Sequence, residues 1–193
     1  MRKEEILIAA SSVFQKYGLQ KVTLDDIAKE CGIKKTALYY YFKNKEEIFI
    51  TMLKRDVEKI RLEIHTKIEC EKTPTAKIRT YMINRLKSFH QMKRYFDIFQ
   101  KDDVPKIYRE IMFKMQKENL QLEFKGLTQV LNSGVEMGVF RQISTTTVAR
   151  MLASITIGMG HAFLAFDIKM NYEKEVDGVL EIIMQGIEKI ATD

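Results

Sequence analysis

The chain has 193 residues, enough for one ordinary domain or two small ones that each bury a core. Hydrophobic residues make up 46% and charged residues 30%, which is typical of a soluble globular protein. The net charge of +6 suits a polyanionic partner such as nucleic acid without requiring one.

The chain lacks the features of an exported or membrane-spanning protein. Its start, MRKEEILIAA, has neither the long apolar run nor the cleavage site of a signal peptide. The most apolar stretch, residues 148–166, contains Arg150 and His161 and no aromatic belt, which favours a buried helix over a membrane span. Cys31 and Cys70 lie far apart, and we expect two buried, reduced thiols and no disulfide between them. We expect a cytoplasmic protein.

Apolar residues at helical spacing begin near the N-terminus. The first predicted helix covers residues 6–17 and ends at Gly18. Thr23 and the acid three residues later, Asp26, form a capping-box pattern at the start of the predicted helix LDDIAKEC. This helix stops at Gly32. A short helix over 35–42 follows, and then a long one over 45–72 that Asn44 caps.

The pattern continues to the C-terminus. Thr73 and Pro74 open the next helix, 93–103 reads as a short helix or an irregular join, and Pro105 opens another helix that runs toward Gly134. Ser144 or Thr145 caps the apolar helix, and Asn171 caps the last. The sequence predicts an all-α fold of about nine helices, with an N-terminal domain over 1–46 and a helical domain over 47–193.

Three residues have the spacing of a helix-turn-helix. Two helices that cross steeply need a small residue at their contact, a glycine in the turn and an aliphatic residue facing inward on the second helix. Ala28, Gly32 and Leu38 meet these needs. The second helix of such a motif enters the major groove of DNA.

The stretch GIKKTALYYYFKNKEE (32–47) concentrates tyrosines and lysines on that second helix. With Leu38 inward, Lys35, Thr36 and Tyr39 can reach the groove, and Tyr40 lies toward the DNA backbone. Lysines attract phosphates and phenols donate to them. Lys45, and Thr23 through its N–H and hydroxyl, can also grip phosphates. Taken alone, such a segment is more often core tyrosines beside a solvated basic face.

The pattern VFQKYGLQKVTLDDIAKECGIKKTALYYYFKNKEEIF resembles the TetR family of bacterial transcription regulators, and the match covers about Ile6 to Phe49. The resemblance implies an all-helical homodimer with a C-terminal ligand pocket. It also implies these DNA-contact positions: Thr23, Lys35, Thr36, Tyr39, Tyr40, Tyr41 and Lys45. Two positions depart from the family pattern: Lys34 replaces a capping Ser or Thr, and Thr36 replaces a common glycine.

A stripe of small residues and a stripe of bulky ones run side by side along the apolar helix. Small residues recurring every four positions let another helix approach closely, so this helix and the last one can build a two-fold four-helix dimer interface. The alternative is that both helices fill the core of one chain. The predicted interface residues are Met151, Ser154, Gly158, Ala162, Val179, Ile183 and Ile187.

Methionine and aromatic residues cluster in the middle of the chain. Flexible, polarizable methionine suits a pocket for an apolar ligand, although core packing explains the same residues. His90 and His161 are candidate polar anchors, with a satisfied structural histidine as the alternative. The candidate ligand residues are Phe89, His90, Phe96, Met112, Met115, Met159, His161 and Phe163.

Catalytic signatures are missing from the sequence. It has no HExxH, GxSxG, phosphate loop or GxGxxG, and its histidines lack metal-ligand spacing, so we expect no enzyme, metal or cofactor. The sequence predicts a dimeric repressor that a small apolar ligand releases from a double-stranded DNA operator. The alternative is a protein-interaction module on a helix-turn-helix scaffold.

Overall fold

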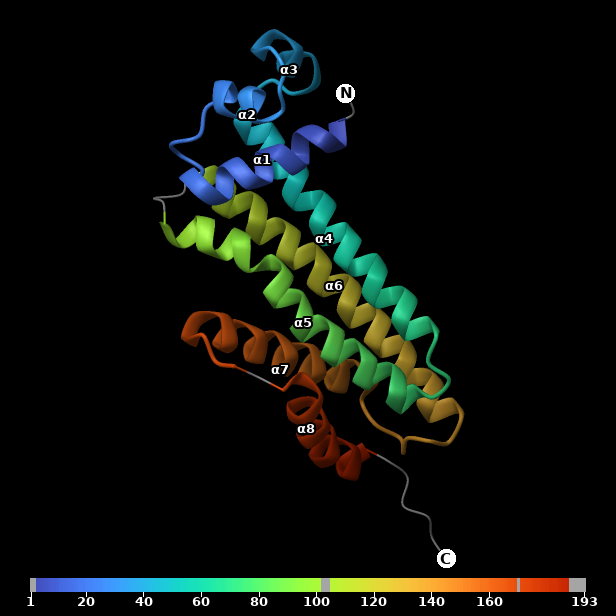
Figure 1. Cartoon of the computed structure of the whole chain (residues 1–193). Helices are drawn as coiled ribbons and strands as arrows, with labels where there is room; N and C mark the ends of the chain where they lie inside the picture. The colour runs from blue at the N-terminus through green and yellow to red at the C-terminus, as the bar shows by residue number, and fades with distance from the viewer. Residues whose placement is uncertain (1–2, 102–104, 170, 188–193) are drawn as a thin grey trace, which may run out of the picture. The chain divides into compact units, whose positions relative to one another are not determined.

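The computed structural model describes residues 3–101, 105–169 and 171–187, with side chains omitted at 99–101 (Figure 1). Its described residues form eight α-helices joined by short connections, which confirms the all-α class. The helices are α1 (Lys3–Tyr17), α2 (Leu24–Glu30), α3 (Lys35–Tyr41), α4 (Lys45–Glu69), α5 (Pro74–Lys101), α6 (Lys106–Glu136), α7 (Thr145–Phe166) and α8 (Tyr172–Ile187).

The described part of the chain has one helix fewer than the sequence predicts, because residues 93–101 continue α5 without a break. No glycine or proline lies between Pro74 and Pro105, so nothing local ends the helix earlier. The remainder of the predicted segment 93–103 lies outside the described residues.

Two of the predicted caps beyond α4 are confirmed, and one differs in its bonding. Thr73 Oγ1 accepts from the Ala76 amide at 3.2 Å at the start of α5, and Asn171 Oδ1 accepts from the Lys174 amide at 3.0 Å at the start of α8. Ser144 occupies the N-cap of α7 but makes no side-chain hydrogen bond to the backbone there. Its hydroxyl lies 2.8 Å from that of Thr147 instead.

Packing divides the chain into two compact units. The first comprises Met1–Arg61 and Met92–Arg109, and the second Leu62–Gln91 and Glu110–Asp193. The predicted boundary at residues 46 and 47 therefore does not coincide with the packing units. The helix-turn-helix and the first part of α4 share a core with the end of α5 and the start of α6.

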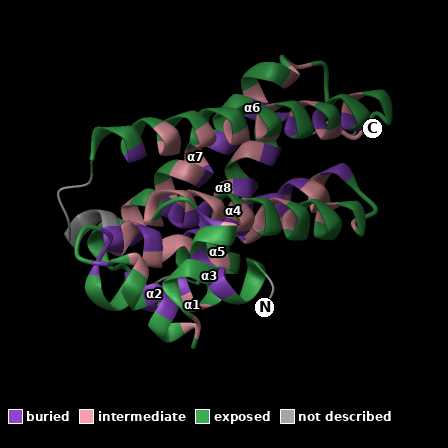
Figure 2. Cartoon of the chain, turned by 90° about the horizontal axis from the view of Figure 1, so that it is seen from above, coloured by how far each residue is buried: buried purple, intermediate pink, exposed green. Residues whose placement is uncertain are grey.

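The first unit is packed around aromatic rings. Phe49 of α4 makes edge-to-face contacts with Phe14, Tyr95 and Tyr108, with ring centroids 5.4, 5.8 and 5.9 Å away. Such pairs stabilise by roughly 0.5–1.5 kcal/mol beyond the area they bury. Buried and exposed positions alternate along the helices, as the amphipathic patterns require (Figure 2).

The second unit has a separate aliphatic core. Its buried residues include Ile78, Met82 and Leu86 of α5, Leu131 of α6 and Leu152 of α7. Phe140 also belongs to this core, since glycine at position 138 adopts φ +71° and turns the chain back after α6.

Helix α7 is the one described helix that is long and apolar enough to cross a membrane. A core helix of a soluble protein has the same composition. Leu152, Ala153 and Thr156 are fully buried in the second unit, and the Thr156 hydroxyl donates to the carbonyl of Leu152 at 2.7 Å. One face of α7 therefore packs into the core of the second unit.

Candidate nucleic-acid interface

The start of α2 is held by a complete capping box. The Asp26 amide donates to Thr23 Oγ1 at 3.3 Å, while the Thr23 amide and hydroxyl donate to Asp26 Oδ2 at 2.8 and 2.7 Å. The bond with the Thr23 side chain lowers the pKa of Asp26 most, and the bond from the Thr23 backbone lowers it further. Both Thr23 donors that the sequence offers to a phosphate are thus used within the box, and a phosphate must compete with Asp26 for them.

The turn between α2 and α3 needs glycine for its backbone conformation. Gly32 has φ +68°, and its N–H donates to the carbonyl of Lys29 at 3.0 Å while the next amide, Ile33, donates to Ala28 at 2.9 Å. This pair of bonds is a Schellman motif that closes α2. Ala28 and Leu38 are 3% and 0% exposed, so both face inward as the helix-turn-helix spacing requires.

The recognition helix α3 begins without a side-chain cap. Lys34 stands at the N-cap with extended backbone, and its side chain makes no capping hydrogen bond, unlike the Ser or Thr that it replaces in the family pattern. Its neighbour Lys35 donates to Asp25 of α2 at 2.5 Å, and this bond raises the pKa of Lys35. Both partners are largely exposed, so the pair adds little stability.

The three tyrosines of α3 differ in exposure. Tyr39 is 51% exposed and Tyr40 86%, whereas Tyr41 is half-buried and meets the Tyr40 ring edge-to-face at 5.3 Å. Thr36 is exposed as well. Phe42, just after the helix, is buried, with only 1% of its surface exposed. The outer face of α3 therefore presents a hydroxyl and two phenol rings to solvent.

Helix α4 starts beside the same surface. Asn44 Oδ1 accepts from the Glu47 amide at 2.8 Å, as predicted, and Glu47 accepts from the Lys43 amide at 2.8 Å. Lys45 Nζ donates to the carbonyls of Gln20 and Val22 at 2.7 and 2.8 Å. An ammonium has three donors, so these two bonds leave one N–H for a phosphate while fastening the α1–α2 loop to α4.

The residues predicted for the dimer interface fall into two groups. Met151 is 49% exposed, Ser154 and Gly158 are exposed, and Ala162 is half-buried, so one face of α7 lacks a partner within the described chain. On α8, Val179 and Ile183 pack partly on the core of their own chain, and Ile187 is only 7% exposed within it. Ile187 therefore fits the core alternative. Ile182, 75% exposed on α8, is absent from the predicted set.

The candidate ligand residues fall in both packing units. Phe96 belongs to the first unit and the other seven to the second. Phe89 and His161 lie together, with ring centroids 5.2 Å apart, while the exposed His90 pairs with the Tyr172 hydroxyl at 2.6 Å. Met112, Met115, Met159 and Phe163 are half-buried, and the last two pack against the core of the second unit.

A polar cluster beside Phe89 was missed by sequence reasoning. Arg85 forms an ion pair with Glu123 at 3.0 Å, donates to Ser88 at 2.9 Å and stacks over the Phe89 ring at 4.8 Å. Burial lowers the pKa of His161, and the charge of Arg85 lowers it further. The available signal was the charged residue Arg85 among the apolar positions Met82, Leu86 and Phe89.

Comparison with known proteins agrees with the helix-turn-helix geometry. Residues 6–52 match the family of bacterial regulatory proteins described as the tetR family. The chain is 24% identical over 140 residues to the HTH-type transcriptional repressor KstR2 of Mycobacterium tuberculosis, and the match covers 72% of this chain and 70% of that protein.

Two solved structures share the fold over nearly the whole chain. A transcriptional regulator from Cytophaga hutchinsonii superposes with a TM-score of 0.76 at 22% identity, covering 96% of this chain and 98% of that one. FadR from Bacillus subtilis in complex with stearoyl-CoA superposes with a TM-score of 0.68 at 20% identity, covering 97% and 100%. The helix-turn-helix geometry and these matches together identify residues 6–52 as a helix-turn-helix of the tetR family of bacterial regulatory proteins, which supports a DNA-binding transcription regulator.

Proposed function

We propose that the chain is a cytoplasmic homodimeric repressor that a small apolar ligand releases from its operator. The exposed face of α3 carries the DNA-binding part of this proposal. Thr36, Tyr39 and Tyr40 project from it, and Lys34 and Lys35 stand at its start. A helix of this size and polarity fits the major groove, where hydroxyls contact base edges and phosphates and rings contact thymine methyls.

The proposed contacts have different tasks. Tyr39 reads base edges, Tyr40 and Tyr41 bind the adjoining backbone, and Lys35 adds phosphate attraction once it exchanges Asp25 for DNA. Thr36 faces the bases, and Thr23 and Lys45 bind phosphates at the flanks of the motif. The phosphate contacts set the register of the protein on DNA, while the contacts of α3 supply the sequence preference.

Two exposed tyrosines provide a matched test of the proposed interface. Tyr39 on α3 and Tyr17 at the end of α1 are 51% and 50% exposed. On the duplex recovered by selection from a random pool, we expect Tyr39→Ala to weaken binding by about 1–3 kcal/mol, the usual cost of a lost base contact. Tyr17→Ala should bind like the unmodified protein in fluorescence anisotropy. Equal affinity for both variants contradicts the assignment of α3.

The dimer part of the proposal rests on the exposed face of α7. A repressor that reads a near-palindromic operator needs two copies of α3 related by a two-fold axis. Met151, 49% exposed on α7, and Met137, 62% exposed after α6, form a matched pair. Met151→Glu should shift sedimentation toward the monomer, whereas Met137→Glu should leave it unchanged. Dimers that persist in Met151→Glu would place the interface elsewhere.

The effector part of the proposal draws on the relatives. The FadR structure contains stearoyl-CoA, which has a long acyl group. The protein described here has methionine and aromatic residues in its second unit. We propose that such a ligand favours a conformation with the wrong spacing between the two recognition helices. Helix α4, which contributes residues to both units, carries the change. A ligand acts in this way only if it binds one conformation better than the other.

Release assays test the effector directly. The protein is held on its selected duplex, and compounds from acyl-CoA esters to small aromatic molecules are added at constant ionic strength. An effector should release DNA and raise the melting temperature of the free protein, since binding to the folded state stabilises it. Thermal stabilisation without release would contradict the repressor mechanism, and release without binding to the protein would point to a direct effect on DNA.

A further inference from the structure

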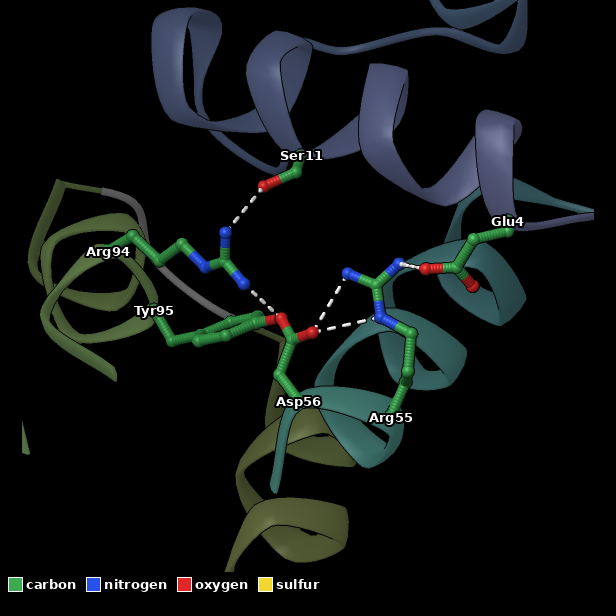
Figure 3. A network of polar contacts seen from close by, with 6 residues as sticks. All are labelled: Glu4, Ser11, Arg55, Asp56, Arg94 and Tyr95. Carbon is green, nitrogen blue, oxygen red and sulfur yellow. Dashed lines mark hydrogen bonds and ion pairs between the residues drawn. The ribbon is translucent and has the colours of Figure 1, made fainter. Parts of the chain in front are cut away.

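A buried carboxylate joins three helices of the first unit (Figure 3). Asp56 of α4 is 8% exposed. Its Oδ2 accepts hydrogen bonds from the Arg94 guanidinium and the Tyr95 hydroxyl, both on α5. Its Oδ1 accepts from Arg55 Nε at 2.9 Å. One side chain of α4 thus holds two residues of α5 and orders an arginine on its own helix.

Both arginines also donate hydrogen bonds to residues of α1. Arg55 Nη1 donates to Glu4 Oε1 at 2.7 Å, and Arg94 Nη1 donates to Ser11 Oγ at 3.1 Å (Figure 3). Glu4 and Ser11 are about two helical turns apart and share one face of α1. The Asp56 carboxylate therefore orders the two guanidinium groups, of Arg55 and Arg94, that bind α1.

Apolar contacts alone leave the position of α1 less well defined. Hydrophobic packing is not directional, whereas hydrogen bonds require a narrow range of distances and angles. A buried ionic cluster is weak evidence for stability, and its best attested role is to select one arrangement among several. Tyr95 remains a donor in this cluster, because burial and then its bond to Asp56 raise its pKa well above the ordinary value.

Helix α1 is the support of the helix-turn-helix. It packs against α2, which packs against α3, and the loop after Gly18 leads straight into the α2 cap. We infer that Asp56 is a positioning residue for operator binding, which sets α1, and through it the recognition helix, against α4 and α5. This inference rests on the proposed function, since it assigns Asp56 a task in binding the operator.

Asp56→Asn tests this role, because it keeps the size of the side chain and removes its charge. Glu58→Gln is the matched control. It removes the charge of an acid on the same helix whose side chain is 54% exposed and which pairs with Arg61 within α4. Affinity is measured for the selected duplex and for a scrambled duplex of the same length. We expect folded Asp56→Asn to lose roughly tenfold more affinity for the selected duplex than for the scrambled one, a typical coupling between separate sites. Glu58→Gln should keep both affinities.

Tyr95→Phe is the alternative test variant if Asp56→Asn does not fold. It keeps the ring against Phe49 and removes the hydrogen bond from the Tyr95 hydroxyl to Asp56. It should lower selectivity in the same direction by a smaller factor. Equal losses on both duplexes would show a structural role alone and overturn the inference, as would unchanged selectivity in a folded variant. If the unmodified protein shows no preference for any duplex, the proposed function fails first, and this inference fails with it.

Discussion

The same added methyl group should change the free energy of unfolding differently at two glycines of α6. A Cβ at Gly126 meets no heavy atom within 4 Å, whereas a Cβ at Gly134 would lie 2.2 Å from a ring carbon of Phe140. The chain turns back after α6 through bonds from the amides of Val139 and Phe140 to the Gly134 carbonyl, at 2.9 and 3.0 Å. The buried Phe140 ring is thereby brought onto Gly134.

The expected difference follows from these two environments. Replacing an exposed helical glycine by alanine stabilises by about 0.8–1 kcal/mol, so Gly126→Ala should raise the free energy of unfolding by that amount. Gly134→Ala gains the same helix propensity, but Phe140 must leave its position, and overpacking a core costs about 1–3 kcal/mol. Since the propensity gain cancels in the comparison, Gly134→Ala should be less stable than Gly126→Ala by about 1–3 kcal/mol.

Urea unfolding followed by circular dichroism at 222 nm measures this difference. Both variants should show the same dependence of free energy on denaturant, because the surface exposed on unfolding hardly changes. Equal stability of the two variants, or a more stable Gly134→Ala, would refute the packing of Phe140 on α6. A loss of stability in Gly126→Ala would refute its open environment.

Three further predictions concern caps, the turn and pH. Lys34→Ser should raise the free energy of unfolding by roughly 0.5–1 kcal/mol, because serine can cap α3 and lysine does not, and urea unfolding measures it. Gly32→Ala should lower it by about 1–2 kcal/mol through the left-handed backbone alone, since no atom crowds that position; a gain in stability would contradict the turn. The hydrogen bond from Arg79 lowers the pKa of Asp177, so the stability from this α5–α8 pair is present above the ordinary pKa of 3.8 and is lost as pH falls through the lowered value. The difference in melting temperature between the unmodified protein and Asp177→Asn should therefore shrink at low pH, and a constant difference would contradict the pair.

Local signals in the sequence predicted much of the fold. Thr23, Asn44, Thr73 and Asn171 lie three residues before the amides that they bind, so their capping bonds depend on neighbouring residues alone. The inward placement of Leu38 likewise follows from helical spacing around the turn. The exposure of Tyr39 and Tyr40 was predictable for the same reason.

Contacts between distant segments were not predictable in this way. Lys45 bonds to carbonyls more than twenty residues earlier, and Asp56 bonds to Arg94 and Tyr95 on another helix. No local pattern marks such partners, because they meet only after the helices pack. For the same reason helical spacing could not separate Ile187, which fills the core of its own chain, from residues that remain exposed on α7.

Selection of duplex DNA from a random pool, using the unmodified protein at moderate salt, tests the central claim most directly. A homodimer with α3 in two successive major grooves should recover a near-palindromic motif whose half-site centres lie about 10 base pairs apart. Tyr39→Ala should recover the motif weakly or with relaxed preference at the contacted bases. Recovered sequences with no shared motif, or the same motif at equal strength with Tyr39→Ala, would contradict the account.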